Sequence, residues 1–191
     1  MNQNILINEM VNLDGKNKTI IKKILLVITG VVFLALLAQV SIFLPFTPVP
    51  ITGQTFGVLL IGLVYGRKLG VSTISAYIAA GTLGLPVFAG LGSGLIFLSP
   101  NGGYVIGYFF MVVLCGYLAE MGWTKSYGKT LIILLLAEIV LYFFGLVQLS
   151  FFVKKDLFLA GLYPFIIGDV IKAFLLTFIL PSTWKFLKNN K

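Results

Sequence analysis

The stretch TLIILLLAEIVLYFFGLVQLSFF, from Thr130 to Phe152, has a single charged side chain, that of Glu138. A transmembrane helix needs roughly 20 predominantly apolar residues, and this stretch is long enough. Lys129 comes directly before it and Lys154 follows it closely, so charged residues bound the apolar segment on both sides. The stretch therefore predicts a helix that spans a membrane.

The whole chain shares this composition. Of its 191 residues, 59% are hydrophobic and 10% are charged, and its mean hydropathy is +1.04. Soluble domains carry about 25% charged residues, and a chain of this size could not bury so much apolar surface in a water-soluble core. The sequence thus predicts one membrane domain over residues 1–191, with the lipid bilayer as its surroundings and a polar, flexible tail over residues 1–19.

Five further apolar segments are separated by breaker residues. All seven prolines fall in the predicted turns or at the predicted helix ends, and proline interrupts helical hydrogen bonding. The fold class that follows is an all-α integral membrane protein, a bundle of six transmembrane helices. The expected spans are Ile24–Phe43, Thr55–Tyr65, Leu69–Leu85, Tyr104–Met121, Thr130–Phe152 and Pro164–Leu180.

The basic residues are distributed unevenly between the two sides of these spans. One side holds only Lys154 and Lys155, next to Asp156. Cytoplasmic loops carry an excess of Lys and Arg, so both termini are predicted to be cytoplasmic. The net charge of +8 is explained by this bias and does not indicate a nucleic-acid partner. The other side holds Lys16, Lys18, Lys22, Lys23, Arg67, Lys68, Lys125, Lys129, Lys185, Lys188 and Lys191.

Small residues recur every four positions in two of the spans. Gly62, Gly66 and Gly70 form one series. Such spacing lets helix backbones approach closely in lipid, so these residues predict tight helix packing without requiring any further role. The second series is Ser72, Ala76, Ala80 and Gly84.

Three ionisable residues, Glu138, Asp169 and Lys172, fall inside predicted spans. Insertion of Asp or Lys there costs roughly 2.5–3.5 kcal/mol, so each is expected to face the interior and to have a partner. Asp169 and Lys172 are three residues apart and therefore share a helix face. They could be a simple local ion pair, but we favour a polar clamp for a ligand, because intramembrane charge usually marks a site. Glu138 is expected to be a hydrogen-bonding group within the bundle.

The predicted outer turns above this pair are unusual. Neither Leu44–Gln54 nor the Gly-rich stretch from Pro86 to Gly103 carries a charge. Asp169 is expected roughly 8–9 Å below the outer end of its helix, with Gln39 and Gln148 at similar depth. A largely apolar pocket with a few polar groups, covered by such turns, suits a small organic ligand.

Several kinds of chemistry are not supported. The chain has no histidine and one cysteine, Cys115, so we expect no metal site and no internal disulfide. The stretch Gly122–Thr130 resembles a phosphate-binding loop but has the wrong glycine spacing and no preceding strand. We therefore expect no enzyme activity and no cofactor, and any ATP hydrolysis would belong to other chains.

Four separated stretches, in this order, resemble the BioY family, the biotin-binding S-components of energy-coupling factor transporters. They are FTPVPITGQTF (Phe46–Phe56), GLPVFAG (Gly84–Gly90), PNGGY (Pro100–Tyr104) and GDVIKA (Gly168–Ala173). The resemblance covers about Leu44 to Pro181. It implies six helices in a bacterial plasma membrane, capture of biotin at the outer face, and partnership with a membrane coupling subunit and two ABC-type ATPases.

The resemblance also implies a set of site residues. Asp169 and Lys172 match the residues expected to hold the polar bicyclic head of biotin, under loops matched by residues 47–54 and 87–104. An ionised Asp only accepts and an ammonium only donates, which suits the two N–H groups and the oxygen of the ureido ring. The predicted ligand-binding residues are Asp169, Lys172, Gln54, Thr52, Phe88, Gly90, Asn101, Tyr104, Gln39 and Gln148.

Three points stay open at this level. Another vitamin with an amide edge would satisfy the same groups. The chain could also be a self-sufficient secondary carrier that uses Asp169 or Glu138 as a proton relay, although such carriers usually show internal repeats. S-components commonly dock the coupling subunit through an Ala-x-x-x-Ala ridge on the first helix. This helix has Gly30, Ala35 and Ala38 instead, which we expect to form a contact face.

Overall fold

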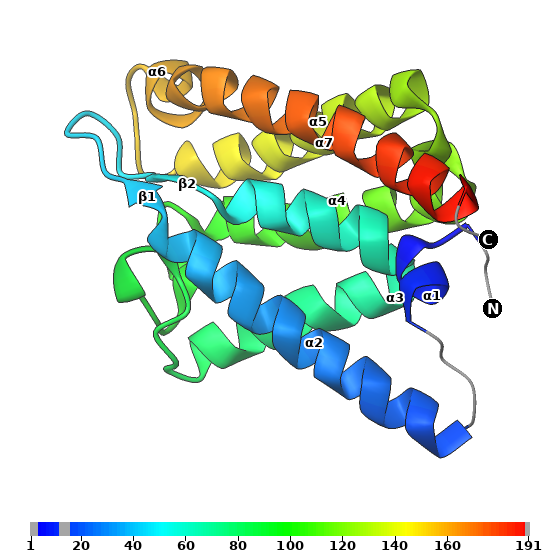
Figure 1. Cartoon of the computed structure of the whole chain (residues 1–191). Helices are drawn as coiled ribbons and strands as arrows, with labels where there is room; N and C mark the ends of the chain where they lie inside the picture. The colour runs from blue at the N-terminus through cyan, green and yellow to red at the C-terminus, as the bar shows by residue number, and fades with distance from the viewer. Residues whose placement is uncertain (1–3, 12–15, 190–191) are drawn as a thin grey trace.

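A computed structural model describes residues 4–11 and 16–189 of the chain (Figure 1). The architecture is a helical bundle with one very short antiparallel hairpin, in which Ser41 pairs with Thr52 and Ile42 with Ile51. The α-helices are α1 (Leu6–Met10), α2 (Lys16–Gln39), α3 (Gln54–Thr82), α4 (Gly102–Glu120), α5 (Tyr127–Leu149), α6 (Leu157–Gly161) and α7 (Tyr163–Asn189). The strands are β1 (Ser41–Ile42) and β2 (Ile51–Thr52), and short 3₁₀ turns are η1 (Ala89–Leu91), η2 (Ile96–Leu98) and η3 (Trp123–Lys125).

Helix α3 reverses its direction at Gly66 (Figure 1). Gly66 has φ +75° and ψ −179°, a conformation that is open essentially to glycine alone. A Cβ placed on Gly70 would lie 3.6 Å from the Cα of Gly62, so the two halves of α3 pack against each other. The backbone N–H of Arg67, just after the reversal, donates to Glu120 Oε1 at 2.9 Å. The two short spans predicted on either side of Gly66 are thus confirmed as separate helical segments.

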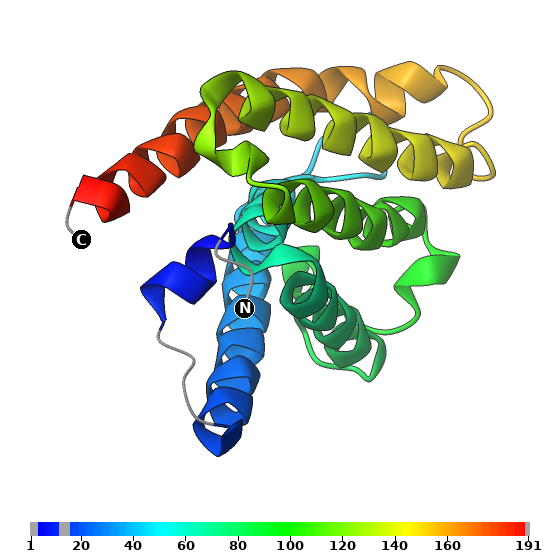
Figure 2. The same ribbon diagram turned by 90° about the vertical axis from the view of Figure 1, so that its right-hand side faces the viewer.

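Five helices, counted with α3 as one and α6 joined to α7, are long and apolar enough to cross a membrane among the residues described. Because α3 folds back at Gly66, its two halves count as separate segments. The described bundle then has the six helical segments that the hydropathy predicted. Figure 2 shows α4 between the folded α3 and the α5–α7 pair. Its residues Met111, Val112 and Cys115 are fully buried.

Small residues allow the close contacts in this core. A Cβ on Gly62 would come within 2.8 Å of the Cβ of Cys115, and one on Gly107 within 3.1 Å of the Leu141 side chain. The packing role predicted for Gly62 and Gly70 is therefore confirmed. Gly66 serves a different purpose, because its conformation produces the turn.

The small residues of α2 do not form a free face. A Cβ on Gly30 would lie 2.6 Å from the Thr73 side chain, and Ala38 is 0% exposed. The expectation that Gly30 and Ala38 form a docking surface is wrong, because these positions are where α2 meets the rest of the bundle. The exposed surface of α2 consists of larger apolar side chains, such as Ile28 and Leu36.

The last helix is longer than predicted. It was expected to end at Leu180, before Pro181, but α7 continues through Pro181 to Asn189. Proline removes one N–H and can be tolerated in membrane helices where neighbouring groups compensate. Beyond Pro181, the Trp184 indole donates to Thr124 Oγ1 at 3.0 Å and holds this end of α7 against η3.

The beginning of the described chain is packed against the bundle. Ile5, Leu6 and Ile7 are buried, with exposed fractions of 3%, 2% and 7%. The Asn4 side chain donates to the carbonyl of Glu120 at 3.1 Å and accepts from Lys125 Nζ at 2.7 Å. The sequence predicts a flexible polar tail over residues 1–19. Residues 4–11 differ from this prediction, because the apolar side chains of Ile5, Leu6 and Ile7 are buried against the bundle. Residues 1–3 and 12–15 of that segment lie outside the described residues.

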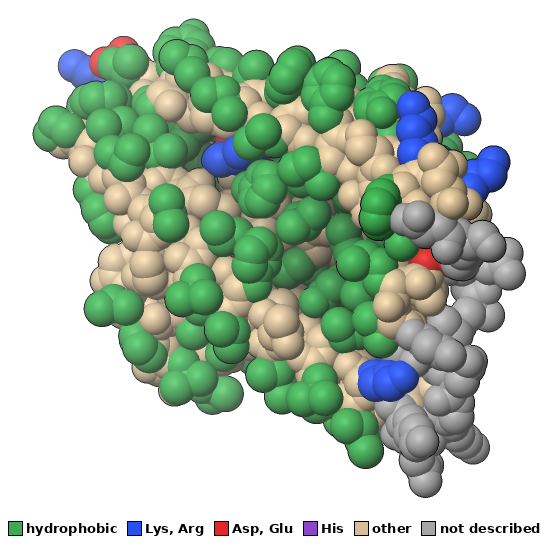
Figure 3. Space-filling view, viewed as in Figure 1, with side chains coloured by type: hydrophobic (Ala, Val, Ile, Leu, Met, Phe, Trp, Pro, Cys, Tyr) green, Lys and Arg blue, Asp and Glu red, His purple; other side chains and the backbone are tan. Residues whose placement is uncertain are grey.

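The charges separate along the bundle as the sequence suggested (Figure 3). The start of α2, the reversal of α3, η3 and the end of α7 all lie at the end that carries α1, and they bring Lys22, Lys23, Lys68, Lys125, Lys129, Lys185 and Lys188 there. Lys154 and Lys155 lie at the opposite end, in the connection between α5 and α6. We predict that the lysine-rich end faces the cytoplasm.

Candidate functional site

Two long connections meet at the end of the bundle opposite α1 (Figure 1). The first runs from α2 through β1 and β2 to α3, and the second runs from α3 through η1 and η2 to α4. Thr47 Oγ1, in the first connection, donates to the carbonyl of Ala160 on α6 at 2.5 Å. The first connection is thereby held over the α5–α7 side of the bundle.

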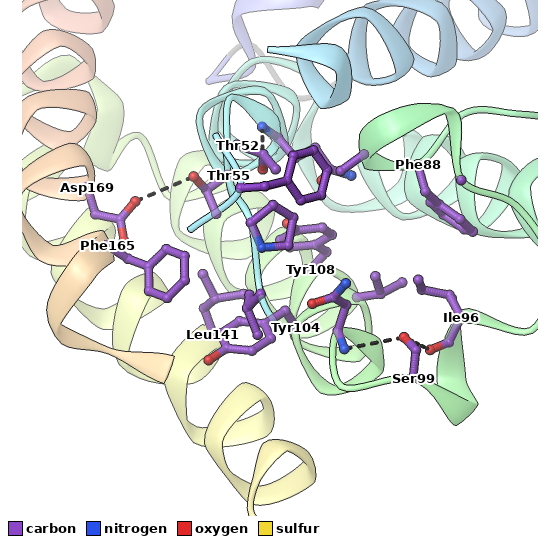
Figure 4. Close-up of a pocket in the computed structure, with 18 of the residues that line it drawn as sticks. Thr52, Thr55, Phe88, Ile96, Ser99, Tyr104, Tyr108, Leu141, Phe165 and Asp169 are labelled. Carbon is purple, nitrogen blue, oxygen red and sulfur yellow. Dashed lines mark hydrogen bonds between the residues drawn. The ribbon is translucent and has the colours of Figure 1, made fainter. Parts of the chain in front are cut away.

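Beneath these connections lies a cavity of about 250 Å³ (Figure 4). Its walls come from both connections and from α3, α4, α5 and α7, so it forms only in the complete fold. Its lining mixes aromatic and aliphatic side chains with a few polar groups. They are Phe43, Val49, Pro50, Thr52, Gln54, Thr55, Phe88, Ala89, Gly92, Ser93, Ile96, Ser99, Asn101, Tyr104, Val105, Tyr108, Leu141, Tyr142, Phe165, Asp169 and Lys172.

Asp169 and Lys172 form the charged part of the wall. Lys172 Nζ lies 2.9 Å from Asp169 Oδ1, and their side chains are 16% and 8% exposed for Lys172 and Asp169 respectively. The pair comes from one face of α7, as the spacing of three residues predicted. Thr55, in the first turn of α3, contacts both members, with its hydroxyl oxygen 2.6 Å from Lys172 Nζ and 3.5 Å from Asp169 Oδ1.

The ammonium group of Lys172 is fully engaged by the protein itself. Its donors go to Asp169, to Thr55 and to the carbonyl of Thr52, the last at 3.1 Å. A lysine has three N–H donors and no acceptor, so Lys172 has no donor to spare in this arrangement. It links α7 to β2 and to the start of α3, and it fixes the carboxylate of Asp169 in place.

Asp169 has a further partner on another helix. The hydroxyl of Tyr142, on α5, donates to Asp169 Oδ2. A carboxylate accepts at about four lone-pair positions, so Asp169 keeps acceptor capacity after these contacts. Asp169 therefore presents an oriented acceptor to the cavity.

Asn101 provides a second acceptor. Its Oδ1 is buried and has no hydrogen-bond partner among the described residues. Asn101 precedes the first turn of α4, where its backbone carbonyl accepts from Tyr104 and Val105 at 3.1 and 3.2 Å. A buried polar atom without a partner is costly, so this oxygen is suited to a donor supplied by a ligand or by water.

Gln54 is held by a chain of hydrogen bonds. Its Nε2 donates to the hydroxyl of Tyr77 at 2.6 Å, and that hydroxyl donates to the carbonyl of Val87 at 2.8 Å. The chain ties the start of α3 to the second connection. Gln54 uses one N–H of its amide in this way, so it keeps a second N–H donor and its carbonyl acceptor for the cavity.

Aromatic side chains cover much of the rest of the wall. Phe88 contacts Tyr77 edge to face, with ring centroids 5.5 Å apart. Tyr104 donates to the carbonyl of Gly161 at 2.6 Å, and a Cβ on Gly145 would come within 2.4 Å of its ring, so only glycine fits there. Figure 4 shows Tyr104, Tyr108 and Phe165 around the same space as Asp169.

Three of the predicted site residues lie outside the lining. Gln39 Nε2 donates to the carbonyl of Phe88 at 3.0 Å, and Gln39 Oε1 accepts from the backbone of Leu91 at 3.0 Å. Gln148 Nε2 donates to the carbonyls of Phe97 and Ser99 at 2.6 and 2.9 Å. These two glutamines anchor the second connection from opposite sides, and Gly90, with φ +65°, lies within its turn η1.

The other predicted residues are brought together at the cavity: Asp169, Lys172, Gln54, Thr52, Phe88, Asn101 and Tyr104. The sequence reasoning missed Thr55, Tyr108 and Tyr142, which also line it. Tyr142 lies one helical turn beyond Glu138 in a highly apolar span, and a polar group in such a span is the signal that could have found it.

Glu138 lies between α5 and α7, beside a second cavity of about 360 Å³ whose wall includes Thr177. Glu138 is 9% exposed, and neither of its carboxyl oxygens has a hydrogen-bond partner among the described residues. The hydrogen bond expected for Glu138 within the bundle is therefore not formed, although Thr177 on α7, whose hydroxyl also has no partner among the described residues, lines the same cavity. Tyr142 and Asp169 line both cavities and separate them.

Comparison with known proteins identifies the family. The model of the BioY family matches residues 7–189. The chain belongs to the BioY family. The probable biotin transporter BioY of Pyrococcus horikoshii is 38% identical over 154 residues, which cover 80% of this chain and 90% of the relative. The biotin transporter BioY of Lactococcus lactis is 37% identical over 142 residues, which cover 71% of this chain and 75% of the relative.

A solved structure agrees with this BioY assignment. The crystal structure of the S-component for biotin from an ECF-type ABC transporter superposes with a TM-score of 0.79 at 32% identity. The match covers 90% of this chain and 95% of that one. This BioY chain is therefore a multi-pass membrane protein of a transporter family, as the hydropathy and the four quoted stretches predicted.

Proposed function

We propose that this BioY chain is the high-affinity biotin-binding S-component of an energy-coupling factor transporter. The observation that carries the proposal is the oriented carboxylate of Asp169, held by Lys172 and Tyr142 at the wall of a cavity that combines aromatic and aliphatic side chains with a few polar groups. The names of the relatives point to the same ligand. Because another vitamin with an amide edge could satisfy the same groups, such a vitamin is compared with biotin in the binding experiment below.

The polar groups suit the ureido ring of biotin. The ring has two N–H donors, and the cavity offers two acceptors for them, Asp169 and the unpartnered Oδ1 of Asn101. The ring oxygen needs a donor. On the Oδ1 side of Asp169 the available donors are the Thr55 hydroxyl and the Lys172 ammonium, so biotin would take over a contact that these groups now make with each other. Lys172 is then both the counter-charge of Asp169 and a donor that exchanges partners.

The apolar parts of biotin match the remaining wall. Phe88, Tyr104, Tyr108 and Phe165 would cover the thiophane ring and the aliphatic tail. The tail carboxylate would lie toward the second connection, where the Ser93 hydroxyl lines the cavity and where the Ser99 hydroxyl would have to give up its bond to the carbonyl of Ile96 to donate to it. Charge-assisted hydrogen bonds from such hydroxyls are stronger than neutral ones.

Uptake against a gradient needs an energy source, and we propose that it comes from other chains. The transporter would consist of this S-component, a membrane coupling subunit and two ABC-type ATPases. Gly122–Thr130, the stretch that resembles a phosphate-binding loop, follows the helix α4 instead of a strand and contains the turn η3 and the first residues of α5.

Calorimetry on the purified chain in detergent tests the binding step. We expect biotin to bind at one molecule per chain without ATP, and an amide-bearing vitamin of another class to leave the heat unchanged. In liposomes the chain alone should bind labelled biotin without accumulating it, even under a proton gradient. Absence of binding would remove the assignment, and gradient-driven accumulation by the chain alone would favour the secondary carrier instead.

A further inference from the structure

Helix α2 crosses the second half of α3 closely at Gly30, and these two segments diverge from there toward the lysine-rich end (Figure 1). Helix α2 stays in contact with the first half of α3, where the Tyr65 hydroxyl donates to the carbonyl of Leu26 at 3.2 Å. The crossing contact is made by Gly30 and Thr73, where a Cβ on the glycine would lie 2.6 Å from the threonine methyl group. Thr73 is fully buried. The glycine lets the backbones meet here, so the helices diverge on the side where larger residues follow.

The divergence opens a groove of about 370 Å³ on the outer surface of the bundle. Its α2 wall is formed by Lys23, Ile24, Val27 and Ile28, and its α3 wall is formed by Lys68, Leu69 and Ser72. The step of seven residues from Lys23 to Gly30 corresponds to roughly 10 Å of helix. The groove therefore runs from the edge of the membrane into its apolar region.

The two lysines stand at the wide end of this groove. Among the described residues, Arg67 pairs with Glu120 and Lys172 pairs with Asp169, and neither Lys23 nor Lys68 takes part in an ion pair. Arg67, which directly precedes Lys68, is held by Glu120 and lies over the ring of Tyr117. The ammonium groups of Lys23 and Lys68 are thus available to an anion at the same place.

The interior of the groove offers nothing polar to compete. The hydroxyl of Ser72 donates to the carbonyl of Lys68 at 2.9 Å, which satisfies it within its own helix. Ile24 and Ile28 are 54% and 53% exposed, so they lie on the surface that faces lipid. The chemistry of the groove is therefore apolar below and doubly cationic at its rim.

We propose that this groove binds one anionic phospholipid, with an acyl chain between α2 and α3 and the phosphate between Lys23 and Lys68. Basic pockets between transmembrane helices on the cytoplasmic side suit anionic headgroups, and each lysine near the membrane surface contributes measurably to the attraction. A bound lipid would fill the space that the crossing at Gly30 leaves open. It would hold α2 at its present angle to α3.

Native mass spectrometry of the purified full chain, with phosphatidylglycerol added to the detergent, measures this binding. The double variant Lys23→Gln/Lys68→Gln should retain phosphatidylglycerol about 30-fold more weakly, from the loss of two surface charges. Ser72→Trp, which fills the groove and keeps both lysines, should lose the lipid to a similar extent. The matched control Lys125→Gln/Lys129→Gln removes two lysines of the same end that lie over Trp184 and Trp123, and it should change retention less than threefold.

Biotin affinity, measured on the same samples, should be equal in all variants and reports that each has folded. Equal retention of phosphatidylglycerol by the parent and by Lys23→Gln/Lys68→Gln would overturn the proposal. So would equal retention of phosphatidylcholine and phosphatidylglycerol by the parent chain. If the lysine variant keeps its lipid but loses ATP-driven uptake with the partner subunits, the groove is a protein-docking surface and the lipid proposal is wrong.

Discussion

Tyr142 on α5 donates a hydrogen bond to Asp169 Oδ2 on α7, and this contact joins the two helices at the wall of the cavity. On its other side, Asp169 accepts from Lys172 of its own helix and from Thr55 of α3. One carboxylate therefore connects three helices. The affinity for a ligand that binds to this carboxylate therefore depends on the relative positions of the three helices.

Asp169→Asn keeps the shape of the side chain and removes its charge. Lys172 would then lie in the membrane region without a counter-charge, and the ureido ring would lose its anionic acceptor. Loss of one partner of a buried charge pair typically costs about 2–5 kcal/mol of binding, so we expect biotin binding to weaken by at least about 30-fold. Calorimetry measures the biotin affinity. The control is Asp156→Asn, in the connection between α5 and α6. Parent-like affinity in Asp169→Asn would make the pair a purely structural one.

Tyr142→Phe removes one hydroxyl and leaves the ring in place. Hydrogen bonds to charged groups contribute about 1.5–3 kcal/mol, so misorientation of Asp169 should lower biotin affinity about tenfold. The melting temperature should fall by several degrees, because the same hydrogen bond joins α5 to α7. Tyr163→Phe, at an exposed tyrosine on the same end of the bundle, is the matched control and should bind as the parent does. An unchanged affinity in Tyr142→Phe would show that Lys172 and Thr55 suffice to orient the carboxylate.

Gln148→Leu tests the second connection as a lid. The amide of Gln148 holds the carbonyls of Phe97 and Ser99 from outside the cavity. Its loss should loosen the lid, so biotin should dissociate about tenfold faster while its association rate changes little, since changes within one interface fall mainly on dissociation. Stopped-flow fluorescence with a labelled biotin separates the two rates. A slower association with unchanged dissociation would mean that Gln148 shapes the entrance instead.

The predictions from sequence succeeded where the information was local. Hydropathy located the helices, and a spacing of three residues placed Asp169 and Lys172 on one face. Thr55 and Tyr142 reach the same carboxylate from α3 and α5, and only the tertiary packing brings them there. Sequence periodicity shows which residues share a face of one helix, but it does not show which residues of different helices come into contact.

Depth alone was a poor guide to side-chain direction. Gln39 and Gln148 were placed in the site because they were expected at the level of Asp169, yet both point to backbone carbonyls of the second connection. A proline interrupts the hydrogen-bond ladder, so the sequence predicts a helix end at Pro181. The helix passes through it, and the contact of Trp184 with Thr124 holds the continuation in place.

Gly66→Ala tests the reversal of α3. The backbone of Gly66 has φ +75°, and an added Cβ would lie 2.8 Å from Ile5 Cδ1 and 3.3 Å from Glu120 Oε1. Strain of this kind costs about 1–3 kcal/mol before any clash, so the yield of folded protein should fall and its melting temperature should drop by several degrees. Gly128→Ala is the control, because nothing lies within 4 Å of a Cβ there. A stable Gly66→Ala protein would mean that the reversal does not depend on glycine.

Glu138→Leu tests whether the second cavity, beside Glu138, takes any part in biotin binding. Both oxygens of Glu138 lack a partner among the described residues, and the residues around them are apolar apart from Thr177, Tyr142 and Asp169. An apolar residue of similar size removes the cost of burying an unpaired polar group, about 1–3 kcal/mol. We therefore expect the melting temperature in detergent to rise by several degrees, at about 2–4 °C per kcal/mol for a chain of this size.

Biotin affinity of Glu138→Leu should stay within about twofold of the parent, because Tyr142 and Asp169 lie between Glu138 and the cavity proposed for biotin. Thr177→Val, which removes the facing hydroxyl without changing the shape, is the control and should show a smaller rise in melting temperature. If Glu138→Leu binds biotin weakly or unfolds at lower temperature, the carboxyl has a partner in the membrane, and a proton relay through Glu138 to Asp169 becomes the reading to test.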